Sequence, residues 1–285
     1  MIEPPKPRVL ILGAGGNLGA ALQDGLRSSR RWSTLPVFSP RGPARRVRID
    51  ITDEHEVDDL LRRTRPDAIV HLAGLTGIEC AQDPKRAADV NVRAVEHVAR
   101  ASLKYGVKTL LFPSTSAVYG DQYDRPATEG SKLDIRSSYA ETKARAEDVL
   151  KDLQREGAGP HAVILRIFNV YGTGLTESLV ERLRSSDPAN PVPLRGLETF
   201  TRDYSEVSEI AKVMEIALEL SGSGLQHSLT LNIGSGVPTT NSRLVEILQH
   251  ENPVHTSVLA GPWSYSCADV TAARRLAVPI PRAIG

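Results

Sequence analysis

The 285-residue chain has few cysteines, few aromatic residues and no excess of charge of either sign. Its two cysteines, Cys80 and Cys267, lie far apart and lack the paired spacing of a metal site. Neither a disulfide framework nor a metal centre is predicted, and both thiols are expected to be buried as small apolar groups. Lysine plus arginine (35) nearly balances aspartate plus glutamate (34). This balance argues against nucleic acid as a partner, because no overall field attracts a polyanion.

Long apolar runs and internal repeats are also missing. No stretch approaches the ~20 residues that span a bilayer, and residues 1–7 lack the apolar core of a secretory signal. A cytoplasmic protein without a membrane partner is therefore expected. With 40% hydrophobic residues, the chain can still bury a sizeable core.

Short apolar segments alternate with helical patterns over the first part of the chain. The predicted strands are 9–12, 35–38, 47–49, 68–72, 109–112 and 162–167. This alternation is typical of a Rossmann-type α/β fold with a doubly wound parallel sheet. The pattern fades after Ile167, and residues 187–191 are expected to form a loop. We predict a sheet domain over residues 1–168 and a smaller mixed lobe over residues 169–285, partly interleaved with it.

One helix has a readable beginning in the sequence. Asp83 can cap the first amides, Pro84 suits the first turn, and an apolar stripe then runs to about Gly106. A continuous helix is predicted over this range.

A glycine-rich turn follows the first predicted strand. Gly13, Gly16 and Gly19 stand three apart, with Asn17 and Leu18 between the last two, and a helical pattern continues from there. Glycines let the backbone turn sharply and approach a pyrophosphate, whose charge is met by free amides at the helix N-terminus. The sheet domain is therefore predicted to bind a dinucleotide at these five residues.

The end of the second predicted strand carries no acidic residue. In dinucleotide folds an acid here usually accepts hydrogen bonds from the adenosine ribose. This chain instead has Ser39, which can donate to a 2′-phosphate, and Arg41, which can neutralise it. NADP is favoured over NAD on this ground. The alternative is that Arg41, Arg45 and Arg46 form a solvated basic loop.

Tyr139 and Lys143 are four residues apart within a helical pattern, so they share a helix face. A nearby ammonium favours the phenolate, and we expect it to lower the pKa of Tyr139 so that the phenol exchanges a proton near neutral pH. Hydroxyl residues at the end of the strand that begins at Thr109 could bind the same substrate oxygen.

Taken together, these motifs resemble those of the extended short-chain dehydrogenase/reductases, the NAD-dependent epimerase/dehydratase family. The family includes nucleotide-sugar epimerases, dehydratases and 4-ketoreductases, and the resemblance extends over nearly the whole chain. The matching segments are 12–19, 50–53, 70–74, 91–92, 114–120, 139–143, 165–172, 202–204 and 231–236.

The resemblance implies the roles of the catalytic residues. Thr115 occupies the family's serine/threonine position, Tyr139 is the general acid/base, and Lys143 contacts the nicotinamide ribose. His71 is expected to be a core histidine. Asn91 could bind a ligand or brace the neighbouring loop.

Further cofactor contacts are implied by the same resemblance. Asp50 and Ile51 would border the adenine, and Leu72 and Ala73 would lie along the cofactor. Asp50 could instead cap the helix that begins near Asp53.

On the substrate side, Asn169 matches a family position that meets sugar or phosphate, and Arg202 matches one that clamps a diphosphate. Arg202 could instead form a local ion pair with Asp203. The chain departs from the family at residues 259–263, where many members carry a second phosphate-binding arginine. Trp263 in this segment could stack on a base or sugar, although packing within the lobe is favoured.

The residue two after Thr115 is Ala117, where dehydratases and decarboxylases of the family carry an acid. Alanine cannot move a proton, so those reactions are disfavoured. Together with the NADP-type loop, this predicts NADPH-dependent reduction of a ketone, with the proton donated by Tyr139. The resemblance implies a nucleotide-linked 4-keto-6-deoxy sugar as the favoured substrate.

Other functions remain open at this point. They are an NAD-dependent nucleotide-sugar epimerase, a ketoreductase of another small carbonyl compound, and a non-enzymatic dinucleotide sensor. By analogy with the family, a homodimer could form through the helix over residues 83–105 and the helix that carries Tyr139.

Overall fold

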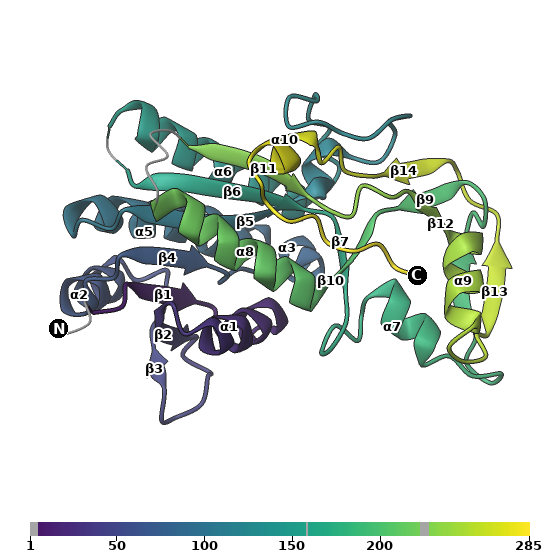
Figure 1. Ribbon diagram of the computed structural model, residues 1–285, viewed down its shortest axis with the longest axis horizontal. Coiled ribbons are helices and arrows are strands. Elements are labelled where there is room, and N and C mark those ends of the chain that lie inside the picture. Colours follow the sequence, from purple (N-terminus) through teal and green to yellow (C-terminus); the bar gives the residue numbers. More distant parts are fainter. Residues whose placement is uncertain (1–4, 158, 223–227) are drawn as a thin grey trace.

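Seven parallel strands form the central sheet of the molecule (Figure 1). The computed structural model describes residues 5–157, 159–222 and 228–285. The strand order is β11-β6-β5-β4-β1-β2-β3. The strands are β1 (Arg8–Leu12), β2 (Ser33–Phe38), β3 (Val47–Arg48), β4 (Ala68–His71), β5 (Thr109–Thr115), β6 (His161–Ile167) and β11 (Leu229–Ile233). The predicted Rossmann-type α/β fold is confirmed.

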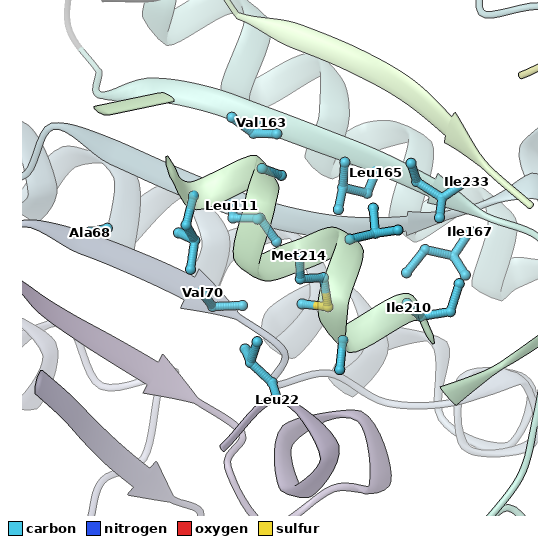
Figure 2. Close-up of a cluster of buried hydrophobic side chains, with 14 of the residues drawn as sticks. Leu22, Ala68, Val70, Leu111, Val163, Leu165, Ile167, Ile210, Met214 and Ile233 are labelled. Carbon is cyan, nitrogen blue, oxygen red and sulfur yellow. The ribbon is translucent and has the colours of Figure 1, made fainter. Parts of the chain in front are cut away.

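Helices cover both faces of this sheet, which explains why its strands are apolar on both sides. The helices on one face are α1 (Asn17–Ser29) and α8 (Val207–Gly222), and those on the other are α2 (Glu54–Thr64), α5 (Ala94–Lys104) and α6 (Ser138–Arg155). Figure 2 shows Met214 and Ile210 of α8 lying over Val70, Leu111 and Leu165 of the strands.

The helix predicted from Asp83 onward is present but interrupted. It follows α3 (Gly77–Gln82) and consists of α4 (Pro84–Ala88), a π-helical turn η1 (Asp89–Arg93) and α5. Asp83 caps it as predicted, since its carboxylate accepts a hydrogen bond from the amide of Arg86 at 2.9 Å. Asn91 lies within this wider turn and on the buried side of the helix, four residues after Ala87 and three before Ala94, which are buried as well.

A smaller lobe lies beyond the carboxyl ends of the sheet strands (Figure 1). Its short strands form three small sheets with the orders β10-β7, β12-β9-β14 and β13-β8. The remaining elements are η2 (Ser116–Tyr119), β7 (Asn169–Tyr171), α7 (Leu179–Arg184), β8 (Val192–Arg195), β9 (Phe200–Arg202), β10 (Tyr204–Glu206), β12 (Thr239–Thr240), α9 (Asn241–Gln249), β13 (Thr256–Leu259), β14 (Ser264–Ser266) and α10 (Thr271–Arg275). The chain after residue 168 thus supplies this lobe and also returns to the sheet as α8 and β11.

Both cysteines are buried, as expected. Over the described ranges, no helix combines the length and the apolar character needed to cross a membrane. The same ranges contain no group of three or more histidine, cysteine or acidic side chains placed to hold a metal ion.

Candidate functional site

The glycine turn joins β1 to α1 at the carboxyl edge of the sheet. Gly13 has a φ of +83°, and a Cβ on it would lie 2.5 Å from the backbone nitrogen of Ala73. A Cβ on Gly19 would lie 2.7 Å from the carbonyl oxygen of Gly13. Both positions therefore require glycine. The turn brings the free amides at the start of α1 beside Leu72 and Ala73, so the predicted cofactor residues at the ends of β1 and β4 lie together.

A loop from the smaller lobe reaches the same turn. The side-chain amide of Asn17, the first residue of α1, donates to the carbonyl oxygen of Gly174 at 2.9 Å. Gly174 has a φ of +85°, and a Cβ there would lie 2.7 Å from Oδ1 of Asn17. The lobe and the glycine turn are thus in direct contact.

Ser39 and Arg41 lie exposed on the loop after β2. The amide of Gly42 donates to the carbonyl oxygen of Ser39 at 2.8 Å, which closes the loop. The ring of Phe38, just before it, lies within 3.2 Å of the Cβ position on Gly15 in the glycine turn. The loop is therefore next to the turn, and its contact with a 2′-phosphate stays a prediction.

Asp50 and Ile51 follow β3 on the same side of the sheet. Asp50 does not cap α2, because its Oδ1 accepts from the amide and the hydroxyl of Thr52, at 3.0 and 2.7 Å. These bonds also lower the pKa of its carboxyl group. The cap is Asp53, which accepts from the amides of the first turn of α2. The alternative role considered for Asp50 is therefore wrong, and its predicted contact with the adenine remains open.

Thr115, Tyr139 and Lys143 lie on two elements that pack together, β5 and α6. Thr115 is the last residue of β5, and the other two lie in the first turns of α6. Nζ of Lys143 donates to the carbonyl oxygen of Pro113 at 2.7 Å and lies 4.4 Å above the centre of the Phe112 ring. The Lys143 ammonium is therefore held at Pro113 of β5, two residues before Thr115.

The pKa of Tyr139 differs from the value expected from the sequence, because it is raised and not lowered. Burial lowers the pKa of Lys143 to about 8. Burial raises the pKa of Tyr139 to about 12, with a smaller contribution from the thiol of Cys80. The predicted lowering of this pKa by Lys143 is thus wrong for this structure, because removal from water disfavours the phenolate. The phenol remains protonated at neutral pH.

His71 and Asn91 have mainly structural surroundings. His71 is fully buried at the end of β4, and burial together with the nearby Lys143 ammonium lowers its pKa to about 4, so the ring is neutral. Oδ1 of Asn91 accepts from the amide of Leu75 at 2.7 Å, and its Nδ2 donates to the Leu75 carbonyl and to Oγ1 of Thr142, both at 3.1 Å. Asn91 therefore braces the loop after β4 against α6.

A pocket of about 640 Å³ opens in the smaller lobe. Its lining residues are Asn169, Val170, Glu177, Ser178, Leu179, Arg182, Pro193, Leu194, Arg195, Phe200, Arg202, Tyr204, Asn241 and Leu259. Both predicted substrate residues, Asn169 and Arg202, are among them. Asn169 lies two residues beyond Ile167, which is paired in register with Thr115. The pocket therefore starts beside the end of β5, which carries Thr115.

Arg202 is held in place from several sides. Its guanidinium lies 3.6 Å above the centre of the Phe200 ring and donates to Oγ of Ser264 at 2.8 Å. Oδ2 of Asp121 is 3.4 Å away. Burial lowers the pKa of this guanidinium, although Asp121 opposes the change. A fixed, partly desolvated cation of this kind suits an anionic ligand.

Asp203 has a different role from the one considered from the sequence. It is fully buried, and its carboxylate accepts from the amide and hydroxyl of Ser235 at 2.8 and 2.6 Å, from the amide of Gly236 at 2.9 Å and from the amide of Ala268 at 3.2 Å. The proposed ion pair with Arg202 is therefore wrong, and Asp203 instead ties β10 to the loops after β11 and β14.

Two arginines of the pocket were missed by the sequence argument. Arg182 lies on α7, and Arg195 ends β8, where it is paired in register with Leu259. Register partners present their side chains on the same face of a sheet, so Arg195 and Leu259 line the pocket side by side. Apolar residues alternate with others over residues 192–195, with Val192 and Leu194 buried. This period of two could have predicted a strand that presents Arg195 on its exposed face.

Trp263 does not line this pocket. It is 42% exposed and stacks on Tyr265, with ring centres 6.0 Å apart and an interplanar angle of 5°. The favoured packing role agrees with this contact, although part of the ring remains open to solvent.

The chain is similar to known enzymes over most of its length. A family model described as NAD dependent epimerase/dehydratase family matches residues 9–234. UDP-glucose 4-epimerase 2 of Oryza sativa subsp. japonica is 25% identical over 297 residues, covering 89% of this chain and 72% of the rice protein. UDP-glucose 4-epimerase of Rhizobium meliloti (strain 1021) is 29% identical over 219 residues, covering 70% of this chain and 66% of that protein.

A solved structure has a closely similar fold. MoeE5 in complex with UDP-glucose and NAD superposes with a TM-score of 0.81 at 27% identity, covering 96% of this chain and 93% of that chain. The relatives are named as epimerases and this neighbour contains NAD, so the comparisons do not support the expected NADPH-dependent reduction and favour the alternative of epimerisation. With the family model spanning the glycine turn, residues 115–143 and β11, the chain belongs to the NAD-dependent epimerase/dehydratase family, the extended short-chain dehydrogenase/reductase enzymes.

Proposed function

We propose that this enzyme is a nucleotide-sugar epimerase that works with bound NAD. It would oxidise one hydroxyl carbon of the sugar and return the hydride to the opposite face of the resulting ketone. One observation carries the proposal: the pocket with three arginines begins at Asn169, two residues beyond the register partner of Thr115 at the end of β5. A diphosphate bound in the pocket would then direct its sugar towards that strand end.

The chain's own residues would handle the proton. Tyr139 in its phenolate form would accept the proton of the sugar hydroxyl when that carbon is oxidised, and would return the same proton to the oxygen when the ketone is reduced, while the Thr115 hydroxyl donates a hydrogen bond to that oxygen. Lys143 provides a nearby positive charge, which favours this phenolate form. Reversible hydride transfer is the chemistry that a bound nicotinamide dinucleotide supplies at the glycine turn.

Ala117 argues for epimerisation rather than loss of water. Its amide donates to Oγ1 of Thr115 at 3.2 Å, so it lies immediately beside the catalytic hydroxyl. Elimination requires a second acid or base near the reacting carbon, and a methyl group supplies neither.

NAD is proposed over NADP because the MoeE5 structure, which is 27% identical to this chain, contains NAD. The side chains of Ser39 and Arg41 still favour NADP, so the binding of both cofactors should be measured. Equilibrium titration with each dinucleotide measures the preference directly. Binding of NADPH at least tenfold tighter than NADH would overturn the proposed cofactor.

The charge of the pocket supports a diphosphate ligand. Arg182, Arg195 and Arg202 line it, against one acidic residue, Glu177. We predict that Arg202→Gln weakens UDP binding by about 10- to 100-fold, the contribution of a charge-assisted hydrogen bond to phosphate. Calorimetric titration with UDP measures this. The matched control is Arg155→Gln, an exposed arginine of α6, which should bind UDP like the wild type.

The deciding experiment incubates the purified protein with UDP-glucose and follows the sugar protons by NMR, with NAD, with NADP and without added cofactor. Appearance of the C4 epimer without net cofactor reduction supports the proposal. Tyr139→Phe should abolish most of this turnover while NAD binding is retained.

Other outcomes assign other activities. Loss of water from the sugar identifies a dehydratase, and stoichiometric oxidation of NADPH by 4-keto sugars identifies the reductase considered first. A panel of UDP-, dTDP- and GDP-sugars left unchanged, with no oxidation of NADH or NADPH by their 4-keto forms, overturns the proposed function.

A further inference from the structure

A buried polar network lies directly behind the catalytic residues. Its centre is Glu147, a fully buried residue of α6 one helical turn beyond Lys143. Oε1 of Glu147 accepts from Oγ of Ser114 at 2.6 Å and from Nε of Arg166 at 3.0 Å. Oε2 accepts from Nη2 of Arg166 at 2.6 Å and from Nζ of Lys151 at 3.0 Å. Both oxygens are therefore fully used.

The network connects three neighbouring strands of the sheet. Arg166 on β6 is in register with Ser114 on β5 and with Asn232 on β11. Nη1 of Arg166 donates to the Tyr119 hydroxyl at 2.8 Å, and that hydroxyl donates to Oδ1 of Asn232 at 2.8 Å. The carboxyl ends of these strands and the end of η2 at Tyr119 are thus fixed relative to α6.

Both sides of the proton-transfer site touch this network. Ser114 immediately precedes Thr115, and Lys143 donates to the carbonyl oxygen of Pro113, the residue before Ser114. We propose that Glu147 is a positioning residue for this site, which holds the Lys143 turn of α6 against the strand end of Thr115 and keeps a carboxylate charge one turn from the Lys143 ammonium.

Stability alone gives a poor account of this arrangement. Replacing a buried ion pair with apolar groups of similar size is often neutral or stabilising. A carboxylate four residues along a helix from a lysine, however, stabilises the charged form of that lysine and so raises its pKa, which an apolar pair cannot do. The network therefore predicts an electrostatic effect on Lys143 in addition to a packing effect.

The other titratable groups around Lys143 leave Glu147 as the main negative charge near it. On β4, His71 is neutral because its pKa is about 4. On α6, Tyr139 is neutral because burial raises its pKa to about 12, and on α3 burial raises the pKa of the Cys80 thiol. Burial lowers the pKa of Lys143 itself, and Glu147 is the largest opposing influence.

The test measures the titration midpoint of Lys143 in the protein without cofactor or substrate. Lysine labelled with ¹³C at Cε is incorporated, and the Lys143 resonance is assigned by its loss in Lys143→Arg. We expect Glu147→Gln to lower the midpoint by one to two pH units, the effect of a charge about one helical turn away. The now unpaired Arg166 cation acts in the same direction.

Two control variants separate charge from packing. Ser114→Ala removes one hydrogen bond to Glu147 but keeps every charge, and Glu141→Gln removes an exposed carboxylate of the same helix. Both should leave the midpoint within about 0.3 pH units of the wild type. A Ser114→Ala shift as large as that of Glu147→Gln would refute the electrostatic role.

Glu147→Gln leaves Arg166 buried without its carboxylate, so a second variant guards against misfolding. Glu147→Gln/Arg166→Met replaces the pair with uncharged groups of similar size, and its midpoint should also fall, by less than in the single variant. An unchanged or raised midpoint in either folded variant overturns the proposal.

The midpoint of Lys143 is measured without turnover, so it is independent of which sugar is the substrate. If the proposed epimerase activity fails while the midpoint shifts, only the function is lost. If epimerisation is found, the alkaline limb of the kcat–pH profile of Glu147→Gln should move to lower pH with little change in KM.

Discussion

Lys143 lowers the stability of the folded protein, and its removal should show this directly. Its pKa falls from 10.5 to about 8 on folding. A difference of this size corresponds to about 3 kcal/mol of unfavourable free energy in the charged, folded state. Lys143 is only half-buried, so solvent screening reduces the figure, and Lys143→Met also loses the bond to Pro113. We expect the free energy of unfolding of the variant to be about 1–2 kcal/mol higher than that of the wild type at pH 7, so that the variant is the more stable protein.

The pH dependence identifies the cause. Below pH 8 the lysine is protonated in both the folded and the unfolded chain, so the folded state bears the full penalty. Between pH 8 and 10.5 the unfolded chain binds more protons than the folded one, so the wild type gains stability as the pH rises. The advantage of Lys143→Met should therefore shrink towards zero by about pH 9.5.

Urea unfolding followed by circular dichroism at pH 7 and at pH 9.5 measures both quantities. Lys132→Met, at an exposed lysine, is the control and should match the wild type at each pH. The reasoning is refuted if Lys143→Met is less stable than the wild type at pH 7, or if its advantage is the same at both pH values.

Two further substitutions test the framework of the site. Asp203→Asn should lower the free energy of unfolding by about 2–4 kcal/mol, measured by urea titration, because an amide presents one acceptor oxygen to donors that now surround two. Gly13→Ala should lower both Tm and the affinity for NAD, because its Cβ would lie 2.5 Å from the nitrogen of Ala73 at a φ of +83°. Gly130→Ala, where a Cβ meets nothing within 4 Å, should do neither, and equal losses in the two alanine variants would contradict the steric account.

The sheet and its cofactor turn could be predicted because their signals are local. The strand before Gly13 and the helix after it are contiguous in the sequence, and the spacing of Tyr139 and Lys143 is a property of one helix. The pairing of Asp203 could not be predicted in the same way. Arg202 and Asp203 fall at the change from β9 to β10, and successive residues of an extended chain point in opposite directions.

Other features depended on contacts between distant segments. Arg195 reaches the pocket beside Leu259 because β8 pairs with β13, and that register cannot be read from either segment alone. The pKa of Tyr139 could not be predicted from its spacing to Lys143, because the depth at which α6 packs decides how far burial raises it.

The return of the chain to the sheet has a consequence for biosynthesis. Residues 168–228 are made after β6 and before β11, its partner at the sheet edge. Until α8 emerges from the ribosome, the apolar face formed by Val70, Leu111 and Leu165 has no cover from that helix (Figure 2). A nascent chain that ends near residue 168 therefore exposes both a strand edge and a hydrophobic surface, the features that recruit chaperones and promote aggregation. The segment up to residue 168 therefore completes its fold only when α8 has covered this face and β11 has paired with β6.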